Sequence, residues 1–232
     1  MTGENAPGDS GFSAAERDAV LRCIASRRDV RGQFLPDPVP DAVLARLLQA
    51  AHAAPSVGFM QPWDFIIVRD PAVKRQVHAA FAAANEEAAQ TFSDERAKLS
   101  RAMKLAGILE APLGVSVTCD RSRGTRLGRT HQPEMDLFSS VCAVQNFWLA
   151  ARAEGVGVGW VSILRYDDLR AALGVPADIQ PIAYLCVGYV SHFKDKPELE
   201  TAGWLPRLPL RDLVWFDGWH QRPDQDSLSD LL

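Results

Sequence analysis

The stretch from about residue 136 to residue 154 constrains the fold more than any other part of the sequence, because it predicts a long helix that is hydrophobic on nearly every side. It ends at Gly155, a residue type that commonly terminates helices. A helix without a polar face has to be buried over most of its surface. We therefore expect a central helix, for which a homodimer interface is a natural place.

Shorter elements are expected on both sides of this helix. Capping residues and helical spacing predict further helices that begin at Ser13 and Pro40, cover most of 73–110, and end at Gly174. Clusters of β-branched and aromatic residues predict buried strands at 65–68, 113–118, 156–163 and 182–190. The helical segment around 88–99 is a candidate lid, and the aperiodic segment 191–220 is expected to be an extended arm. We expect one domain over 13–220, with flexible tails at 1–12 and 221–232.

Charge and composition exclude several classes of function. A net charge of -4 and a pI near 5.7 provide no general basic field for nucleic acid. No apolar run reaches the roughly 20 residues that a membrane-spanning helix needs. The first residues lack the basic and apolar parts of a signal peptide, so we expect a cytoplasmic protein.

The cysteines are widely spaced and form no CxxC pair, and the histidines do not cluster. We therefore expect no metal site and four reduced thiols in the core, namely Cys23, Cys119, Cys142 and Cys186.

Three arginines and one aspartate lie within five residues at the predicted end of the first helix, in Arg27-Arg28-Asp29-Val30-Arg31. Guanidinium groups match the geometry of phosphate, and each charge-assisted hydrogen bond contributes about 1.5–3 kcal/mol. A solvated turn with local ion pairs explains the same cluster, with Asp29 as an arginine partner or a helix-end cap. The cluster alone leaves both interpretations open.

The segment Pro55–Trp63, with the sequence PSVGFMQPW, leads from a helix end directly into a predicted strand. A rigid loop at such a position can present Ser56 and Gln61 to a ligand. Together with the arginine cluster, this segment resembles the nitroreductase-like flavoprotein family, whose arginine-rich motif and PSxxNxQPW-type loop bind flavin mononucleotide (FMN). Phe59 stands where flavin reductases of the family usually have Asn, and the whole segment is similar to the branch that forms 5,6-dimethylbenzimidazole.

The resemblance to that branch extends from about residue 14 to residue 219. It includes Gly128-Arg-Thr-His131 with Met135-Asp136, and the segment GVGVGWVS at 155–162. It implies an α+β sandwich in which helices wrap a mainly antiparallel sheet. It also implies an obligate homodimer whose long central helices meet and whose C-terminal arms extend over the partner.

The resemblance further implies which residues contact the flavin. Arg27, Arg31 and, from the arm, Arg207 would bind the phosphate, whereas Ser56 and Gln61 would contact the ribityl chain or the ring. The complete expected set is Arg27, Arg28, Asp29, Val30, Arg31, Ser56, Gln61, Lys104, Ser162 and Arg207.

Two residues have expected catalytic roles. Ser162 would lie near the reactive N5 atom of the flavin, where reductases often have Glu. Asp29 would accept a proton during fragmentation of the flavin, with its pKa lowered by the neighbouring arginines. Gly157 and Gly159 either form part of a tight turn or allow the strand backbone to approach the flavin. His131 receives no role.

The implied reaction is the oxygen-dependent fragmentation of reduced FMN (FMNH2) to 5,6-dimethylbenzimidazole, the lower ligand of vitamin B12, and erythrose 4-phosphate. FMN is then a substrate, O2 a co-substrate, and NAD(P)H is needed only by a separate flavin reductase that supplies FMNH2. Two alternatives stay open: an NAD(P)H-dependent nitro- or flavin reductase that retains its FMN, and a non-catalytic flavin-binding module.

Overall fold

The structure is a computed structural model that describes residues 11–91 and 105–221. Its internal contacts divide the chain into two compact units, 1–195 and 196–232. The first unit contains the sheet and most of the helices. That residues 13–220 form one domain remains a prediction.

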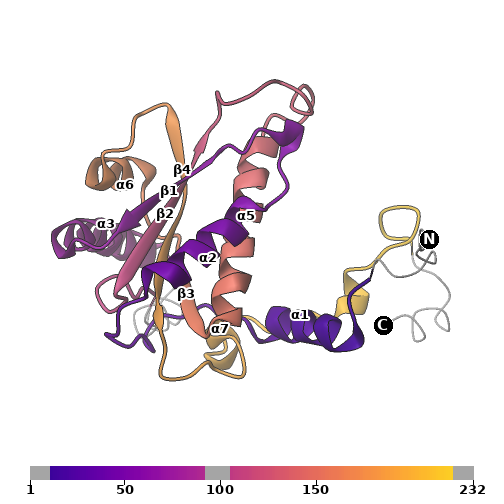
Figure 1. Ribbon diagram of the computed structural model, residues 1–232, viewed down its shortest axis with the longest axis horizontal. Coiled ribbons are helices and arrows are strands. Elements are labelled where there is room, and N and C mark those ends of the chain that lie inside the picture. The colour runs from indigo at the N-terminus through magenta and orange to yellow at the C-terminus, as the bar shows by residue number, and fades with distance from the viewer. Residues whose placement is uncertain (1–10, 92–104, 222–232) are drawn as a thin grey trace, which may run out of the picture. The chain divides into compact units, whose positions relative to one another are not determined.

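A four-stranded antiparallel sheet forms the centre of the first unit (Figure 1), in the order β1-β2-β4-β3. Its strands are β1 (Trp63–Val68), β2 (Leu113–Asp120), β3 (Val156–Val161) and β4 (Ile179–Tyr189). All three pairings are antiparallel. The expected α+β class and the four predicted strands are therefore confirmed.

Helices cover both faces of this sheet (Figure 1). On one face, α2 (Asp41–His52) and α5 (Met135–Ala153) pack against inward-facing strand residues such as Leu185 and Val187. On the other face, α3 (Pro71–Gln90) and α6 (Tyr166–Leu173) pack against Tyr184 and Cys186. Successive residues of β4 thus supply two separate cores, as the two-residue repeat of a strand requires.

The long apolar helix α5 is buried on one side only. Ala143, Val144 and Phe147 have no exposed surface, whereas Phe138 is 56% and Val141 39% exposed. The expectation of burial on most sides is therefore wrong for the single chain.

The same exposed side of α5 carries Cys142, so the prediction of a core thiol is wrong for this cysteine. It is correct for Cys119 and Cys186, which are buried, and Cys23 is half-buried. All four thiols are free.

The first helix, α1 (Ala14–Ser26), begins with the predicted capping box of Ser13 and Glu16. Its C-cap is Arg27, so the arginine cluster follows the helix end as expected. None of its residues is buried, and the apolar face predicted from the sequence remains exposed at Val20, Leu21 and Ile24.

The predicted helix over 73–110 is only partly confirmed. Helix α3 extends to Gln90, but residues 105–110 form a turn without helical structure. Pro112 disfavours a helix immediately before it, and Gly107 lies so close to the chain at Arg31 that an added Cβ would be 2.5 Å from the Arg31 carbonyl oxygen. Lys104 and most of the candidate lid lie outside the described residues.

Within the second unit, the described residues 196–221 contain two short helical segments, α7 (Glu198–Thr201) and η2 (Leu210–Asp212), and are otherwise irregular. An aromatic cluster lies before residue 221, where the rings of Trp215 and His220 are 4.5 Å apart between centroids.

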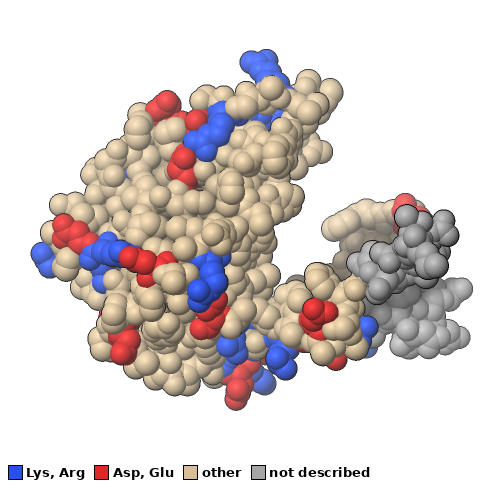
Figure 2. Space-filling view, in the orientation of Figure 1, with Lys and Arg blue, Asp and Glu red and all other residues tan. Residues whose placement is uncertain are grey.

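Figure 2 shows acidic and basic side chains close together over the face drawn there. Ion pairs of the first unit include Arg46 with Glu154 and Arg165 with Glu87. Among the described residues, no helix combines the length and the apolar content needed to cross a membrane.

Candidate functional site

The segment that follows α1 lies alongside strand β3. The Val30 amide donates to the Val158 carbonyl at 3.0 Å, in a parallel bridge between Asp29 and Val158. The Trp160 amide donates to Asp29 Oδ1 at 2.9 Å, and Arg31 Nη2 donates to Asp29 Oδ2 at 2.5 Å. Both carboxylate oxygens of Asp29 are therefore held at the edge of the sheet, with 27% of the side chain exposed.

Gly157 and Gly159 make this close approach possible. A Cβ added at Gly159 would lie 2.0 Å from the Val30 carbonyl oxygen, and one at Gly157 would lie 3.1 Å from a Val30 methyl group. The two glycines thus make room for the chain segment that carries Asp29. That the strand backbone at these two positions also approaches a flavin remains a prediction.

The arginines next to Asp29 have different surroundings. The Arg27 guanidinium lies over the Trp148 ring, 4.6 Å from its centroid. Arg28 donates to the carbonyls of Ala25 and Arg27 at 2.8 and 2.7 Å, and also to the carbonyl of Asp195. Arg28 therefore caps the C-terminal end of α1, where carbonyl groups lack helical partners. That Arg28 contacts phosphate remains a prediction.

Ser162 follows β3 directly and is exposed. It lies two residues beyond Trp160, whose amide binds Asp29. The two residues with expected catalytic roles therefore both belong to the β3 edge.

The second predicted flavin loop, 56–61, contains the short helix η1 (Val57–Phe59). Ser56 Oγ accepts from the Gln61 amide at 3.1 Å, and Gln61 Nε2 donates to the Phe59 carbonyl at 2.9 Å. Three residues have left-handed backbone angles: φ is 54° at Gly58, 52° at Phe59 and 46° at Gln61. Such angles are unfavourable for Phe and Gln, so the surrounding structure has to maintain them.

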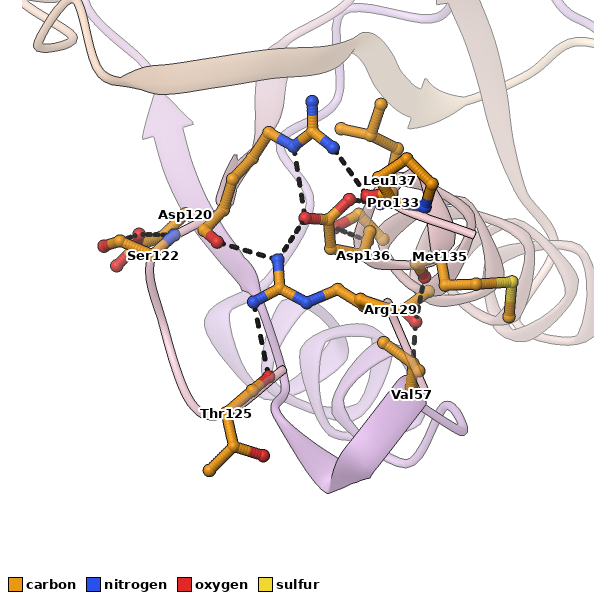
Figure 3. Close-up of polar contacts among 12 residues, drawn as sticks. Val57, Asp120, Ser122, Thr125, Arg129, Pro133, Met135, Asp136 and Leu137 are labelled. Atoms are coloured by element: carbon orange, nitrogen blue, oxygen red, sulfur yellow. Dashed lines mark hydrogen bonds and ion pairs between the residues drawn. The ribbon is translucent and has the colours of Figure 1, made fainter. Parts of the chain in front are cut away.

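That support comes from the start of α5 and from the loop before it. Val57 N donates to Ser139 Oγ at 3.0 Å (Figure 3). A Cβ added at Gly58 would meet the Leu127 carbonyl at 3.0 Å, and one at Gly128 would meet a Val57 methyl group at 2.6 Å. The loop 56–61 therefore packs tightly on the turn at 127–128.

The turn at 127–128 is fixed by a buried ionic cluster (Figure 3). Asp136 Oδ2 accepts from Arg129 Nη1 at 2.6 Å and from Arg121 Nε at 3.1 Å, while Oδ1 accepts from the Leu137 amide at 2.8 Å. Asp136 has no exposed surface. Burial by itself raises the pKa of Asp136, but the hydrogen bonds from Arg121, Arg129 and the Leu137 amide together lower it.

The sequence did not predict this cluster or the role of Ser139. Two signals were available. Arg129 and Asp136 belong to segments that resemble the family, and Asp136 lies in the first turn of the apolar helix α5, a position that favours negative charge. The pairing with Arg121, 15 residues away, had no signal in the sequence.

The two predicted flavin-binding segments lie near opposite ends of α5. Loop 56–61 is attached at Ser139, whereas the chain after α1 is attached where Arg152 Nε donates to the Ser26 carbonyl at 3.2 Å. At 1.5 Å per residue these attachment points are about 20 Å apart along the helix. Within one chain, the structure does not bring the two segments together. Arg207 belongs to the second unit and is exposed.

Comparison with known proteins identifies the fold. A family model described as "Nitroreductase family" matches residues 24–189. The chain belongs to the nitroreductase family. Crystallised iodotyrosine deiodinase, bound to FMN and 3-iodo-L-tyrosine, has a TM-score of 0.70 over 86% of this chain and 100% of its own, at 20% identity. This likeness concerns the fold.

Within the nitroreductase family, curated relatives are similar over most of the chain. A 5,6-dimethylbenzimidazole synthase of Rhodospirillum rubrum is 42% identical over 85% of this chain and 94% of its own length. One of Rhodobacter capsulatus is 40% identical over 85% of this chain and 96% of its own. A putative NAD(P)H nitroreductase of Bacillus subtilis is 29% identical over 84% of this chain and 92% of its own.

Proposed function

We propose that this nitroreductase-family chain is a 5,6-dimethylbenzimidazole synthase, which fragments FMNH2 with O2 to 5,6-dimethylbenzimidazole and erythrose 4-phosphate and releases the pyrimidine portion of the flavin as the remaining product. The observation that carries the proposal is the difference in similarity between two groups of relatives. Synthases match at 37–42% identity, whereas relatives named as NADH dehydrogenases or NAD(P)H nitroreductases match at 25–31%.

The residues after α1 fit an anionic ligand such as the FMN phosphate. Arg27, Arg28 and Arg31 offer guanidinium groups within five positions, and Arg28 Nε is a buried donor without an acceptor among the described residues. Guanidinium donors match phosphate oxygens in geometry and charge. Ser56, Gln61 and Arg207 remain proposed contacts, and so does Lys104, which the structure does not describe.

When bound, FMNH2 supplies the electrons that reduce O2, and the protein supplies binding and proton transfer. Asp29 is the proposed proton acceptor, because its carboxylate is fixed by the Trp160 amide and by Arg31 and is still partly exposed. Ser162 is proposed to place its hydroxyl beside the reacting edge of the flavin. The chain holds these two groups on one strand edge, which limits their relative motion.

A homodimer with shared sites is part of the proposal. Within one chain the two predicted flavin segments are attached about 20 Å apart along α5, so an antiparallel second copy is needed to place them at one flavin. Apolar side chains are exposed on both α1 and α5, and they offer a surface for such a partner. Leu21 on α1 and Phe138 on α5 are each 56% exposed. The C-terminal arm is proposed to extend over the partner.

Replacement of Asp29 by Asn tests the catalytic assignment. The Asn Oδ1 atom still accepts from the Trp160 amide, whereas Nδ2 is a donor and releases Arg31. Because Arg31 keeps its charge for the phosphate, we expect oxidised FMN to bind with at most a few-fold change in Kd. Formation of 5,6-dimethylbenzimidazole from FMNH2 and air should fall by at least about 100-fold, the scale of a lost acid-base group. The matched control is Asp41→Asn, because Asp41 is 83% exposed and pairs with Arg69 at the start of α2.

Equal product from Asp29→Asn and the parent would make Asp29 structural. Steady NAD(P)H oxidation by the parent with retained FMN would instead favour a nitro- or flavin reductase. Tight FMN binding without either reaction would favour a flavin-binding module.

A further inference from the structure

Phe59 has two unfavourable features at once. The residue is 81% exposed, and its backbone has a left-handed φ of 52°. An aromatic side chain gains no hydrophobic stabilisation when it stays in water, and a bulky residue is disfavoured in the left-handed region. Neither feature helps the chain to fold, and strain of this kind concentrates at functional positions.

The neighbours of Phe59 maintain this conformation. The Phe59 carbonyl accepts from Gln61 Nε2 at 2.9 Å, and the Phe59 amide donates to the Ser56 carbonyl at 3.1 Å. On either side of Phe59 the loop is anchored, by the Val57–Ser139 hydrogen bond and by Met60, which is only 6% exposed. The loop is thus fixed to its own chain while the ring of Phe59 remains outside the core.

The ligand that suits this ring is flat and apolar on its faces. Ser56 and Gln61, in the same loop, can supply polar contacts to the ribityl chain, whereas Phe59 has no polar atom in its side chain. A conjugated ring system stacks on an aromatic side chain, which gains attraction beyond the burial of surface. A phosphate or a sugar hydroxyl would gain nothing from the phenyl ring.

We propose that Phe59 is a specificity-determining residue that packs against the ring system of the flavin and removes water from it. The flavin is the one bound by the Arg27–Arg31 segment of a second copy, so this inference rests on the proposed function. Water exclusion favours fragmentation of FMNH2 over simple reoxidation to FMN, because ordered apolar walls keep competing proton transfer away.

Three variants test this role, with Phe12→Ala as the matched control, since Phe12 is 78% exposed and lies outside the loop. Phe59→Ala and Phe59→Gly should raise the Kd for oxidised FMN roughly tenfold, as a lost ring–ring contact predicts. Both should also convert a larger share of FMNH2 to FMN and a smaller share to 5,6-dimethylbenzimidazole. Phe59→Tyr, which keeps the ring, should change both measurements less than Phe59→Ala does, and Phe12→Ala should match the parent in both.

Thermal unfolding of the flavin-free protein separates this role from a structural one. Glycine adopts a positive φ without strain, so Phe59→Gly should leave Tm unchanged or raise it by about 2–4 °C. A fall in Tm of about 10 °C or more would show that the ring stabilises the fold, and would overturn the inference. A Kd of Phe59→Gly for FMN that equals the Kd of the parent would also overturn the inference.

These results are distinguishable from a failure of the proposed function. If the parent forms no 5,6-dimethylbenzimidazole while Phe59→Gly still weakens FMN binding, the synthase assignment is wrong and the flavin contact is supported. If the parent forms product and Phe59→Gly binds FMN and partitions FMNH2 as the parent does, only the inference about Phe59 is wrong.

Discussion

Asp136 is the one carboxylate residue among those described that is fully buried, and its charge is paired. It has no exposed surface and accepts from Arg121 and Arg129, with side-chain exposures of 40% and 14%. Asp136→Asn leaves two guanidinium groups without their carboxylate, which costs about 3–5 kcal/mol when a pair is buried. We expect a loss near the lower limit, because Arg121 keeps contact with water.

Urea unfolding measures this loss. Asp64→Asn is the control, since Asp64 binds Arg123 in two hydrogen bonds of 2.8 and 2.9 Å but is 50% exposed. An exposed pair contributes less than about 1 kcal/mol. Similar free energies of unfolding for the two variants would contradict the structural account of Asp136.

The pKa of Asp136 predicts a pH dependence of stability. Its hydrogen bonds lower the pKa in the folded state, whereas the unfolded state should have the ordinary value of about 3.9. The contribution is therefore complete above pH 4 and is lost as pH falls through the lower, folded-state pKa. Urea unfolding of parent and Asp136→Asn should give a large difference at neutral pH that shrinks below pH 4. A difference that grows on acidification would refute this assignment.

At the scale of elements, the contact between β3 and the segment 29–30 depends on Gly159. Gly159→Ala places a Cβ 2.0 Å from the Val30 carbonyl oxygen, so the segment has to move. Overpacking of this kind costs about 1–3 kcal/mol. Hydrogen exchange should become faster at the Val30 and Trp160 amides, which bind Val158 and Asp29.

Gly174→Ala is the control for that experiment. Gly174 has a φ of 66° and nothing within 4 Å of an added Cβ, so its replacement strains only the end of α6. Gly174→Ala should lower the free energy of unfolding by about 1 kcal/mol and leave hydrogen exchange at the Val30 and Trp160 amides unchanged. If hydrogen exchange at both amides is as slow in Gly159→Ala as in the parent, the position of segment 29–30 does not depend on Gly159.

Most elements could be predicted because their signals are local. The capping box at Ser13, the start of α2 at Pro40 and the C-terminal Gly174 of α6 depend only on nearby residues, and all three are present. The turn at 105–110 could not be predicted, because it results from packing of Gly107 on the distant Arg31. The exposure of Cys142 is likewise a property of packing.

Less of the candidate site than of the fold could be predicted from the sequence. The arginine cluster and the loop 56–61 were found as motifs, but the contact of Asp29 with Trp160 spans 131 residues. The left-handed angle at Phe59 was not predicted either, since Phe rarely adopts it and the Ser139 and Leu127 contacts that support it are distant.

The proposed shared flavin site requires two copies of the whole molecule. Ile24→Glu places a charge on α1, where Ile24 is 48% exposed in the single chain. We expect sedimentation to show a shift from dimer towards monomer, with weaker FMN binding because each flavin then loses one of its two segments. Ala82→Glu on the exposed side of α3 is the control and should remain dimeric. A parent protein that sediments as a monomer and binds FMN tightly would contradict the shared site.

A synthase consumes its flavin, whereas a reductase or a flavin-binding module retains it. The most direct measurement supplies FMNH2 labelled with ¹³C in its dimethylbenzene ring to the protein in air and analyses the products by mass spectrometry. We expect labelled 5,6-dimethylbenzimidazole, an equal amount of erythrose 4-phosphate and a matching loss of total flavin. Complete recovery of the label as FMN, with no 5,6-dimethylbenzimidazole, would contradict the proposed synthase function.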